Sequence, residues 1–359
     1  MLNAIPFVYH FVSLFSWEWN LYGNKMKIAV VGGGAVGLTT ALELQKELRN
    51  AEISVFASDF NKTVSHVAPG IFRIGSAYAG PTEAITKNWV QDSFEYYDNI
   101  RRTQDSSVAG VTSISGYMFA NSSPERVKSQ WMEGLVPEFR RVTDDEFNLV
   151  GGNWKYGSFV STLLTECGVY LPWARKKLEG SGVNLITRKV DSLAEFNRDW
   201  DVIMNCTGFG SRYLCKDKRM IPISGQVLKV RAPWIKTFFY GEINTFVIPG
   251  LNDTITLGGS RNFDSQDTTL CPYDAAAIRE RCENLVPSLK KAEVLRREVG
   301  VRPYREGNVR VEAERVENGS VKLVHNYGHG GYGVCTAPGT AKYAIKLAKD
   351  FHRSSMAKL

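Results

Sequence analysis

The sequence predicts an α/β protein built from two interleaved domains. Residues 27–56 pass from an apolar run through a glycine turn and a helical pattern to a second apolar run, as a strand, a helix and a strand do. Residues 227–257 hold short strand-like runs separated by Pro and Gly turns, which is typical of an antiparallel sheet. A chain of 359 residues suits two domains of ordinary size.

The glycine turn has the spacing of a nucleotide-binding motif. Gly32, Gly34 and Gly37 fit G-x-G-x-x-G directly after the apolar run 28–31. The first glycine permits a sharp turn, the second lets the backbone approach a pyrophosphate, and the third lets helix and strand pack closely. Asp59 stands where an acid that binds a ribose hydroxyl is expected. An ordinary glycine-rich turn is the alternative, but the complete pattern favours a Rossmann-like dinucleotide-binding unit.

The composition limits the kinds of partner. The net charge of +7 is spread along the chain without a run of five basic residues, which argues against a nucleic-acid partner. The hydrophobic share of 43% is that of a globular protein, and apolar runs are too short to span a membrane. We therefore expect small, anionic substrates and neither a nucleic-acid nor a membrane partner.

Metal binding is not indicated. The six cysteines include no C-x-x-C pair, so we expect free thiols. His325 and His329 are four residues apart, but Gly328 and Gly330 disfavour the helix that would bring them to one face. We expect no metal.

The two ends suggest different locations. Residues 1–25 look like an N-terminal extension before Met26, and within it Ala4–Trp17 resembles the apolar part of a signal peptide, which would imply secretion. Ala357-Lys358-Leu359 is a variant of the tripeptide that the peroxisomal import receptor reads. We expect the peroxisomal matrix, with the import receptor as a partner if that ending is used, and secretion as the alternative.

The remaining elements follow from periodicity and turn residues. They are a loop at 63–73, a helix at 86–100, a strand at 111–119, mixed patterns at 159–178, strands at 183–190, 201–204, 227–230, 246–248 and 254–257, a strand with a glycine turn at 322–334, and a helix at 340–351. We assign 26–75, 180–222 and 296–359 to a discontinuous dinucleotide-binding domain, and 76–179 and 223–295 to an α+β substrate domain built on an antiparallel sheet.

Four motifs in this order carry a family resemblance: VVGGGAVGL from residue 30, NCTGFGSR from 205, VRPYR from 301 and HNYGHGGYG from 325. Together they resemble the D-amino-acid oxidase family of flavoproteins, over nearly all of 26–351. The resemblance implies FAD as the cofactor. It implies that FAD is bound by Gly32, Gly34, Ala35, Val36, Gly37, Asp59, Thr63, Ser65, Gly70, Ile71, Val190, Thr207, Gly330, Gly331, Tyr332, Gly333 and Cys335.

The resemblance also implies the substrate site and the reaction. Arg302 matches the arginine that pairs with the substrate α-carboxylate, and Gly331 lies beside it. Arg261, after a glycine pair, resembles members that act on acidic D-amino acids, and Arg73 adds a second cation where relatives with neutral substrates have glutamine. The implied reaction moves a hydride from Cα to flavin N5 without a side chain acting as acid or base, and molecular oxygen is then reduced to hydrogen peroxide.

Several positions depart from the family pattern. Phe246 replaces a tyrosine that helps to hold the α-carboxylate, and Cys335 replaces a threonine. Ser58 occupies the position that the ribose-binding acid has in the family, and Asp59 follows it one residue later. Three other readings stay open: an oxidase of neutral D-amino acids or N-methyl glycine-like amines, an NAD-dependent dehydrogenase, and a flavin-binding protein without turnover. An exposed turn residue is the alternative for Arg261.

Overall fold

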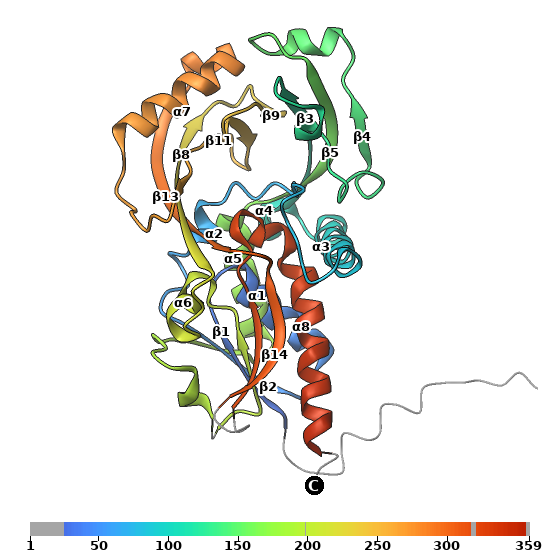
Figure 1. The fold of residues 1–359 in the computed structure, drawn as a ribbon, viewed down its shortest axis with the longest axis vertical. Coiled ribbons are helices and arrows are strands. Elements are labelled where there is room, and N and C mark those ends of the chain that lie inside the picture. The colour runs from blue at the N-terminus through green and yellow to red at the C-terminus, as the bar shows by residue number, and fades with distance from the viewer. Residues whose placement is uncertain (1–24, 198, 317–320, 357–359) are drawn as a thin grey trace, which may run out of the picture.

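The computed structural model describes residues 25–197, 199–316 and 321–356, which form two sheets, one above the other in Figure 1. Most of the N-terminal extension, including Ala4–Trp17, and the tripeptide 357–359 lie outside the described residues. Within the described residues, no helix combines the length and the apolar character needed to cross a membrane.

The parallel sheet, the lower one in Figure 1, contains six strands in the described residues. In spatial order these are β14 (Arg310–Val316), β15 (Val321–Tyr327), β7 (Val202–Asn205), β1 (Lys27–Val31), β2 (Glu52–Ala57) and β6 (Asn184–Thr187). All neighbouring strands run parallel except β14, which is antiparallel to β15. The carboxyl ends of β1, β2 and β7 therefore meet at one edge, where open α/β sheets bind ligands.

The antiparallel sheet contains nine strands in the described residues. They are β12 (Asn262–Phe263), β8 (Met220–Arg231), β11 (Thr254–Gly258), β10 (Phe246–Pro249), β9 (Phe238–Tyr240), β3 (Val111–Ala120), β5 (Tyr156–Thr165) and β4 (Glu138–Arg141) in spatial order, with β13 (Glu293–Arg305) paired to β8. Only the β3–β9 pair runs parallel among these described strands. The predicted fold, with a Rossmann-like unit and an interleaved antiparallel sheet, is confirmed.

The helices and short 3₁₀ turns pack around both sheets. The longer helices are α1 (Ala35–Glu47), α3 (Glu83–Thr103), α5 (Cys167–Gly180), α7 (Pro272–Leu285) and α8 (Gly333–Met356), and the short ones are α2 (Val64–Val67), α4 (Ser106–Ala109) and α6 (Ser211–Leu214). The 3₁₀ turns are η2 (Pro124–Val127), η3 (Asp145–Leu149), η4 (Leu193–Phe196), η5 (Gly208–Gly210), η6 (Pro287–Lys291) and η7 (Gly330–Tyr332).

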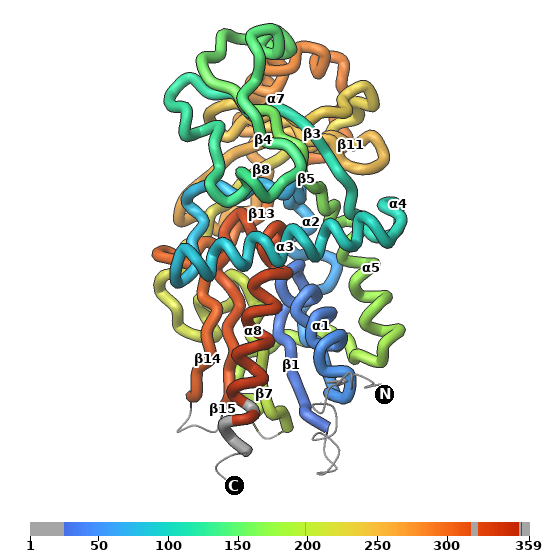
Figure 2. The backbone as a smooth tube through the Cα atoms, turned by 90° about the vertical axis from the view of Figure 1, so that its right-hand side faces the viewer, coloured from blue at the N-terminus to red at the C-terminus, as the bar shows by residue number. Residues whose placement is uncertain are grey.

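Alternation along the strands places apolar side chains on both faces of the parallel sheet, as a sheet covered on both sides requires. Ile28 and Val30 of β1 belong to the core shared with α1 and α8, whereas Ala29 and Val31 pack with Phe196 of η4 on the other face. The core of the antiparallel sheet lies under α7, a helix that the sequence analysis did not identify. Figure 2 shows α3 crossing between the two sheets above α8.

Two groups of elements pack with the other layer from the one that the predicted domain boundaries suggest. Residues 296–305, assigned to the dinucleotide-binding domain, belong to β13 and pair with β8 from Glu293–Arg231 to Arg305–Met220, which also draws 220–222 into the antiparallel sheet. Helices α3 and α5 were expected in the substrate domain. In the structure α3 packs on α8 and α5 packs on α1, and both α8 and α1 cover the parallel sheet. The predicted boundaries follow the motifs, whereas the chain passes from one sheet to the other at the ends of strands and helices.

The two histidines of the glycine-rich motif are buried and neutral. His325 Nε2 lies 2.8 Å from Glu314 Oε2, and His329 Nε2 lies 3.1 Å from the hydroxyl of Thr340. Burial, with the nearby Arg310, lowers the pKa of His325 to about 4, and burial lowers the pKa of His329 to about 3. Each ring therefore contributes to the packed core as a neutral hydrogen-bonding group.

These pKa values predict a loss of stability in acid. Because the folded-state pKa values lie below the unfolded value of about 6.5, the unfolded chain binds more protons as the pH falls from 6.5 toward 4. We expect each histidine to remove about 1.4 kcal/mol per pH unit in this range from the free energy of unfolding. Urea denaturation at pH 7.5 and 5 measures this loss of stability. In the H329Q variant the loss should be smaller by the contribution of one histidine. An unchanged pH dependence of stability in H329Q would contradict the lowered pKa of His329.

The glycine turn predicts a second effect. A Cβ on Gly37 would overlap the carbonyl oxygen of Gly32, which is backbone and has no room to move away. We expect Gly37→Ala to lower the free energy of unfolding by about 2 kcal/mol or more, as overpacking does. Gly168→Ala is the matched control, because no atom lies within 4 Å of that Cβ. Equal stability of the two variants in thermal unfolding would refute the close packing.

Candidate cofactor and substrate site

A cavity of about 480 Å³ extends from the carboxyl edge of the parallel sheet to β8 and β13 of the antiparallel sheet. Many of the predicted site residues line it: Gly32, Gly34, Ala35, Val36, Asp59, Thr63, Ser65, Val190, Thr207, Phe246, Arg302, Gly330, Gly331 and Gly333. These residues come from seven separate stretches of the chain, so the fold brings together what the motifs suggested. We call the part of the cavity at β1 and β2, which holds the predicted nucleotide-binding residues, its nucleotide end, and the part at β13, which holds the predicted Arg302, its substrate end.

The nucleotide end is formed by the turn between β1 and α1. Gly32 has φ +134°, a conformation that residues with a Cβ rarely adopt, and its missing side chain makes room for the carbonyl of Cys206. A Cβ on Gly34 would lie 3.1 Å from the hydroxyl of Ser65, which accepts a hydrogen bond from Ala35 N at 3.0 Å. The helix therefore begins without a bulky side chain, and its first N–H groups lie at the cavity.

Asp59 lies at the cavity but is partly committed to its own turn. Its Oδ1 accepts hydrogen bonds from the N–H groups of Asn61 at 2.6 Å and Lys62 at 3.0 Å. The bond from Asn61 is the main cause that lowers the pKa of this carboxyl. Lys62, Arg188 and Lys189 also line this end, so the surroundings of Asp59 are cationic.

The substrate end contains a guanidinium without a carboxylate partner. Arg302 lies on β13, and its Nη1 donates to the carbonyl of Ser260 at 3.4 Å; within the described residues it takes part in no ion pair. Gly225 on β8 makes room for it, because a Cβ there would overlap Nη1. Burial and the positive charge of Arg261 lower the pKa of Arg302 to about 10, so it stays charged at neutral pH.

Neither of the other two predicted cations lines the cavity. Arg261 is exposed and does not line the cavity, yet it is close enough for its charge to act on Arg302. Arg73 is half-buried, with its Cζ 4.5 Å from the ring centre of Tyr240 and its Nε 3.1 Å from Met118 Sδ. Tyr240 in turn packs against Phe246 at 5.7 Å between ring centroids. Neither arginine pairs with a carboxylate of the described residues.

Five predicted cofactor residues support the cavity without lining it. Gly37 packs on Gly32, and Gly70 has φ +77° beside the carbonyl of Thr165. Ile71 bridges to β5, and its carbonyl accepts from Cys335 Sγ at 3.0 Å. Tyr332 packs edge-on against Tyr78 at 5.5 Å.

Other residues at the cavity were missed. Gly225 and Gly300 lie opposite each other in the β8–β13 register and open space there for Arg302 and α2. Isolated glycines inside strand patterns were the available signal, since they mark a close approach of backbone or ligand. Asn326 and Tyr327 precede the glycines of the last motif and also line the cavity.

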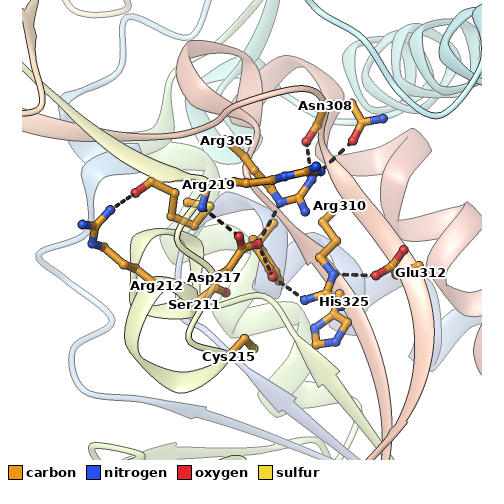
Figure 3. A network of polar contacts seen from close by, with 12 residues as sticks. Ser211, Arg212, Cys215, Asp217, Arg219, Arg305, Asn308, Arg310, Glu312 and His325 are labelled. Carbon is orange, nitrogen blue, oxygen red and sulfur yellow. Dashed lines mark hydrogen bonds and ion pairs between the residues drawn. The ribbon is translucent and has the colours of Figure 1, made fainter.

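A polar network fixes the strand end behind Arg302. Asp217 accepts from Arg305 Nε at 2.8 Å (Figure 3). It also accepts from the hydroxyl of Tyr327 at 2.8 Å, and Tyr327 accepts from Arg310 at 2.8 Å. Burial raises the pKa of Asp217, but these hydrogen bonds outweigh the effect of burial, so the pKa lies below the usual value of an aspartate. The network joins β13 and β15, which border the cavity, to β14.

The cavity fits the expected FAD. At the glycine cradle formed by Gly32 and Gly34, a Cβ would overlap the carbonyl of Cys206 or lie 3.1 Å from the hydroxyl of Ser65. Because neither residue has a side chain, the backbone can be approached closely by a pyrophosphate. Asn326 is fully buried at the cavity, and its Oδ1 has no hydrogen-bond partner in the described residues. A ligand with hydroxyl or N–H donors would satisfy that oxygen.

Comparisons with known proteins agree with this geometry. A family model described as FAD dependent oxidoreductase, abbreviated DAO, matches residues 27–347. The chain is 36% identical to D-aspartate oxidase of Homo sapiens over 331 residues, which covers 91% of this chain and 96% of that protein. It is 33% identical to D-amino-acid oxidase of Streptomyces coelicolor, covering 90% and 96%. Glycine oxidase from Geobacillus kaustophilus shares the fold with a TM-score of 0.76 at 15% identity, covering 91% and 95%.

The family match spans most of the described chain and includes the residues of the glycine cradle and of Arg302. The chain therefore belongs to the DAO family of FAD-dependent oxidoreductases, and FAD is its cofactor.

Proposed function

We propose that the protein oxidises acidic D-amino acids, a substrate class that comprises D-aspartate and D-glutamate, to the 2-oxo acid, ammonia and hydrogen peroxide. The observation that carries the proposal is a cluster of positive charge at the substrate end, where Arg302 and Arg261 have no carboxylate partner in the described residues. Two adjacent cations favour a ligand with two negative charges. The relatives named D-aspartate oxidase support the same class.

Each arginine has a separate role in this proposal. Arg302 binds the substrate α-carboxylate, because its planar guanidinium can donate two parallel hydrogen bonds. Gly331 lies beside it, with a Cβ position 3.8 Å from Arg302 Cδ, and leaves room for the substrate backbone. Arg261 binds the side-chain carboxylate, and Arg73 adds positive charge from the side of Tyr240.

The chain orients the substrate, and FAD supplies the oxidation by accepting a hydride from Cα. Phe246 lines the cavity without a hydroxyl, so it contributes shape and excludes water but holds no carboxylate. His329, also at the cavity, is neutral and its Nε2 faces Thr340, so it is not placed as a general base. Rate enhancement then rests on positioning.

Anaerobic titration with D-aspartate tests turnover itself. We expect the flavin absorbance to bleach with D-aspartate and to stay unchanged with L-aspartate, followed by peroxide release when oxygen is admitted. Unbleached flavin with every D-amino acid tested would leave a binding protein without turnover.

The exposure of Arg261 favours a second candidate, an oxidase of neutral D-amino acids, and substitution separates the two. We expect Arg261→Ala to lower kcat/KM for D-aspartate about 100-fold, the loss of one charge-assisted pair, and to change the value for D-alanine less than threefold. Arg231→Ala is the control, because Arg231 is exposed and pairs with Glu293 outside the cavity. Equal losses for both substrates in R261A would favour the neutral class.

We also propose that the protein acts in the peroxisomal matrix, where its peroxide would be contained. The support is the tripeptide Ala357-Lys358-Leu359, which lies outside the described residues. A fluorescent protein fused to the N-terminus should locate to peroxisomes in eukaryotic cells, and deletion of Leu359 should release it to the cytosol. Unchanged location after the deletion would refute this address.

A further inference from the structure

His325 lies behind the cavity wall and is linked to it by one side chain. Its Nδ1 lies 3.1 Å from Asn205 Nδ2, and Asn205 Oδ1 lies 2.8 Å from the hydroxyl of Thr207 and 3.3 Å from its backbone N. Thr207 lines the cavity, whereas Asn205 and His325 are fully buried. A continuous chain of hydrogen bonds therefore runs from the core to the cofactor cavity.

The donor and the acceptor of each hydrogen bond between Thr207 and His325 follow from the groups at the two ends of this series. The backbone N–H of Thr207 must donate, so it faces the oxygen of the Asn205 carboxamide, and the amide nitrogen faces His325. His325 Nδ1 must then accept, which places the ring proton on Nε2. That proton is donated to Glu314 at 2.8 Å.

Glu314 is held as an acceptor by a second donor. Arg310 Nη2 donates to the same Oε2 at 2.8 Å, and Figure 3 shows Arg310 beside His325. Asn205 Nδ2 also lies 3.1 Å from Cys215 Sγ and 3.4 Å from Ser211 Oγ, so its second hydrogen has a partner in α6 or beyond it. The carboxamide is thus fixed on both sides.

These hydrogen bonds determine how the Thr207 hydroxyl can bind a ligand. The Thr207 hydroxyl donates its single proton to Asn205 Oδ1. Ser211 Oγ lies 2.7 Å from the Thr207 hydroxyl, and because that proton is already used, Ser211 must donate to it. The Thr207 hydroxyl is left with acceptor capacity alone. A cofactor group that bonds to it must be an O–H or N–H donor.

We propose that His325 is a positioning residue for FAD: as an Nε2–H imidazole it fixes the Asn205 carboxamide, which holds Thr207 as an acceptor at the cavity wall. The inference concerns the cofactor and is independent of the substrate. The proposed role of His325 requires a hydrogen-bond acceptor at the position of Nδ1 and does not require the imidazole ring itself. Asparagine places its Oδ1 where histidine has Nδ1, whereas glutamine reaches the Nε2 position instead.

FAD affinity tests the proposal without relying on catalysis. Apoprotein variants are titrated with FAD, and the dissociation constant is read from flavin fluorescence, with thermal unfolding recorded beside it. We expect His325→Gln to weaken FAD binding about tenfold, because the Asn205 carboxamide loses the acceptor that orients it. The dissociation constant of His325→Asn for FAD should stay within about threefold of the wild-type value. Equal weakening in the two variants would overturn the role of the Nδ1 acceptor.

A double-mutant cycle identifies the route. If His325 acts through Thr207, the effect of H325Q should shrink at least threefold in the Thr207→Val background, whereas a purely structural role gives additive effects that refute the proposal. Should H325Q fail to fold, ¹⁵N-histidine NMR of the wild-type holoprotein decides. A proton on Nε2 of His325 supports the relay, and a proton on Nδ1 contradicts it.

Discussion

Uncompensated positive charge at Arg302 is the constraint on which the rest of the site depends. A half-buried guanidinium is stable only when its hydrogen bonds are satisfied, and Arg302 has one long bond, to the carbonyl of Ser260. The β8–β13 pair gives it room through Gly225, and the Asp217 network fixes the end of β13 three residues later. The fold therefore keeps a cation ready at a cavity wall, which is the arrangement that an anionic substrate requires.

In the proposed function, the two sheets supply different parts of the binding site. The parallel sheet supplies the glycine cradle and the helix N-terminus for the nucleotide end, and the antiparallel sheet supplies Arg302, Phe246 and the neighbouring Arg261. The segment 70–73 joins them, since Ile71 bridges to β5 and accepts from Cys335 of α8. The cavity consequently lies where the sheets meet, and the cofactor and substrate ends share one space.

Local patterns predicted the parts of this structure that local physics determines. The β1–α1 turn followed from the spacing of Gly32, Gly34 and Gly37, because only glycine satisfies both φ and close packing there. The layer to which residues 296–305 belong could not be read in the same way, because it depends on pairing with a strand some 70 residues away. The buried partners of His325 were hidden for the same reason, since Asn205 and Glu314 meet it only in the folded chain.

The central claim is that the substrate end is built for two negative charges. Binding of substrate-like acids that cannot be oxidised measures this most directly, through the change in flavin absorbance of the holoprotein. The account predicts that malonate or succinate binds at least tenfold more tightly than acetate or propionate, and that the difference shrinks in R261A as one ion pair is lost. Equal affinities for the dicarboxylates and the monocarboxylates would contradict it.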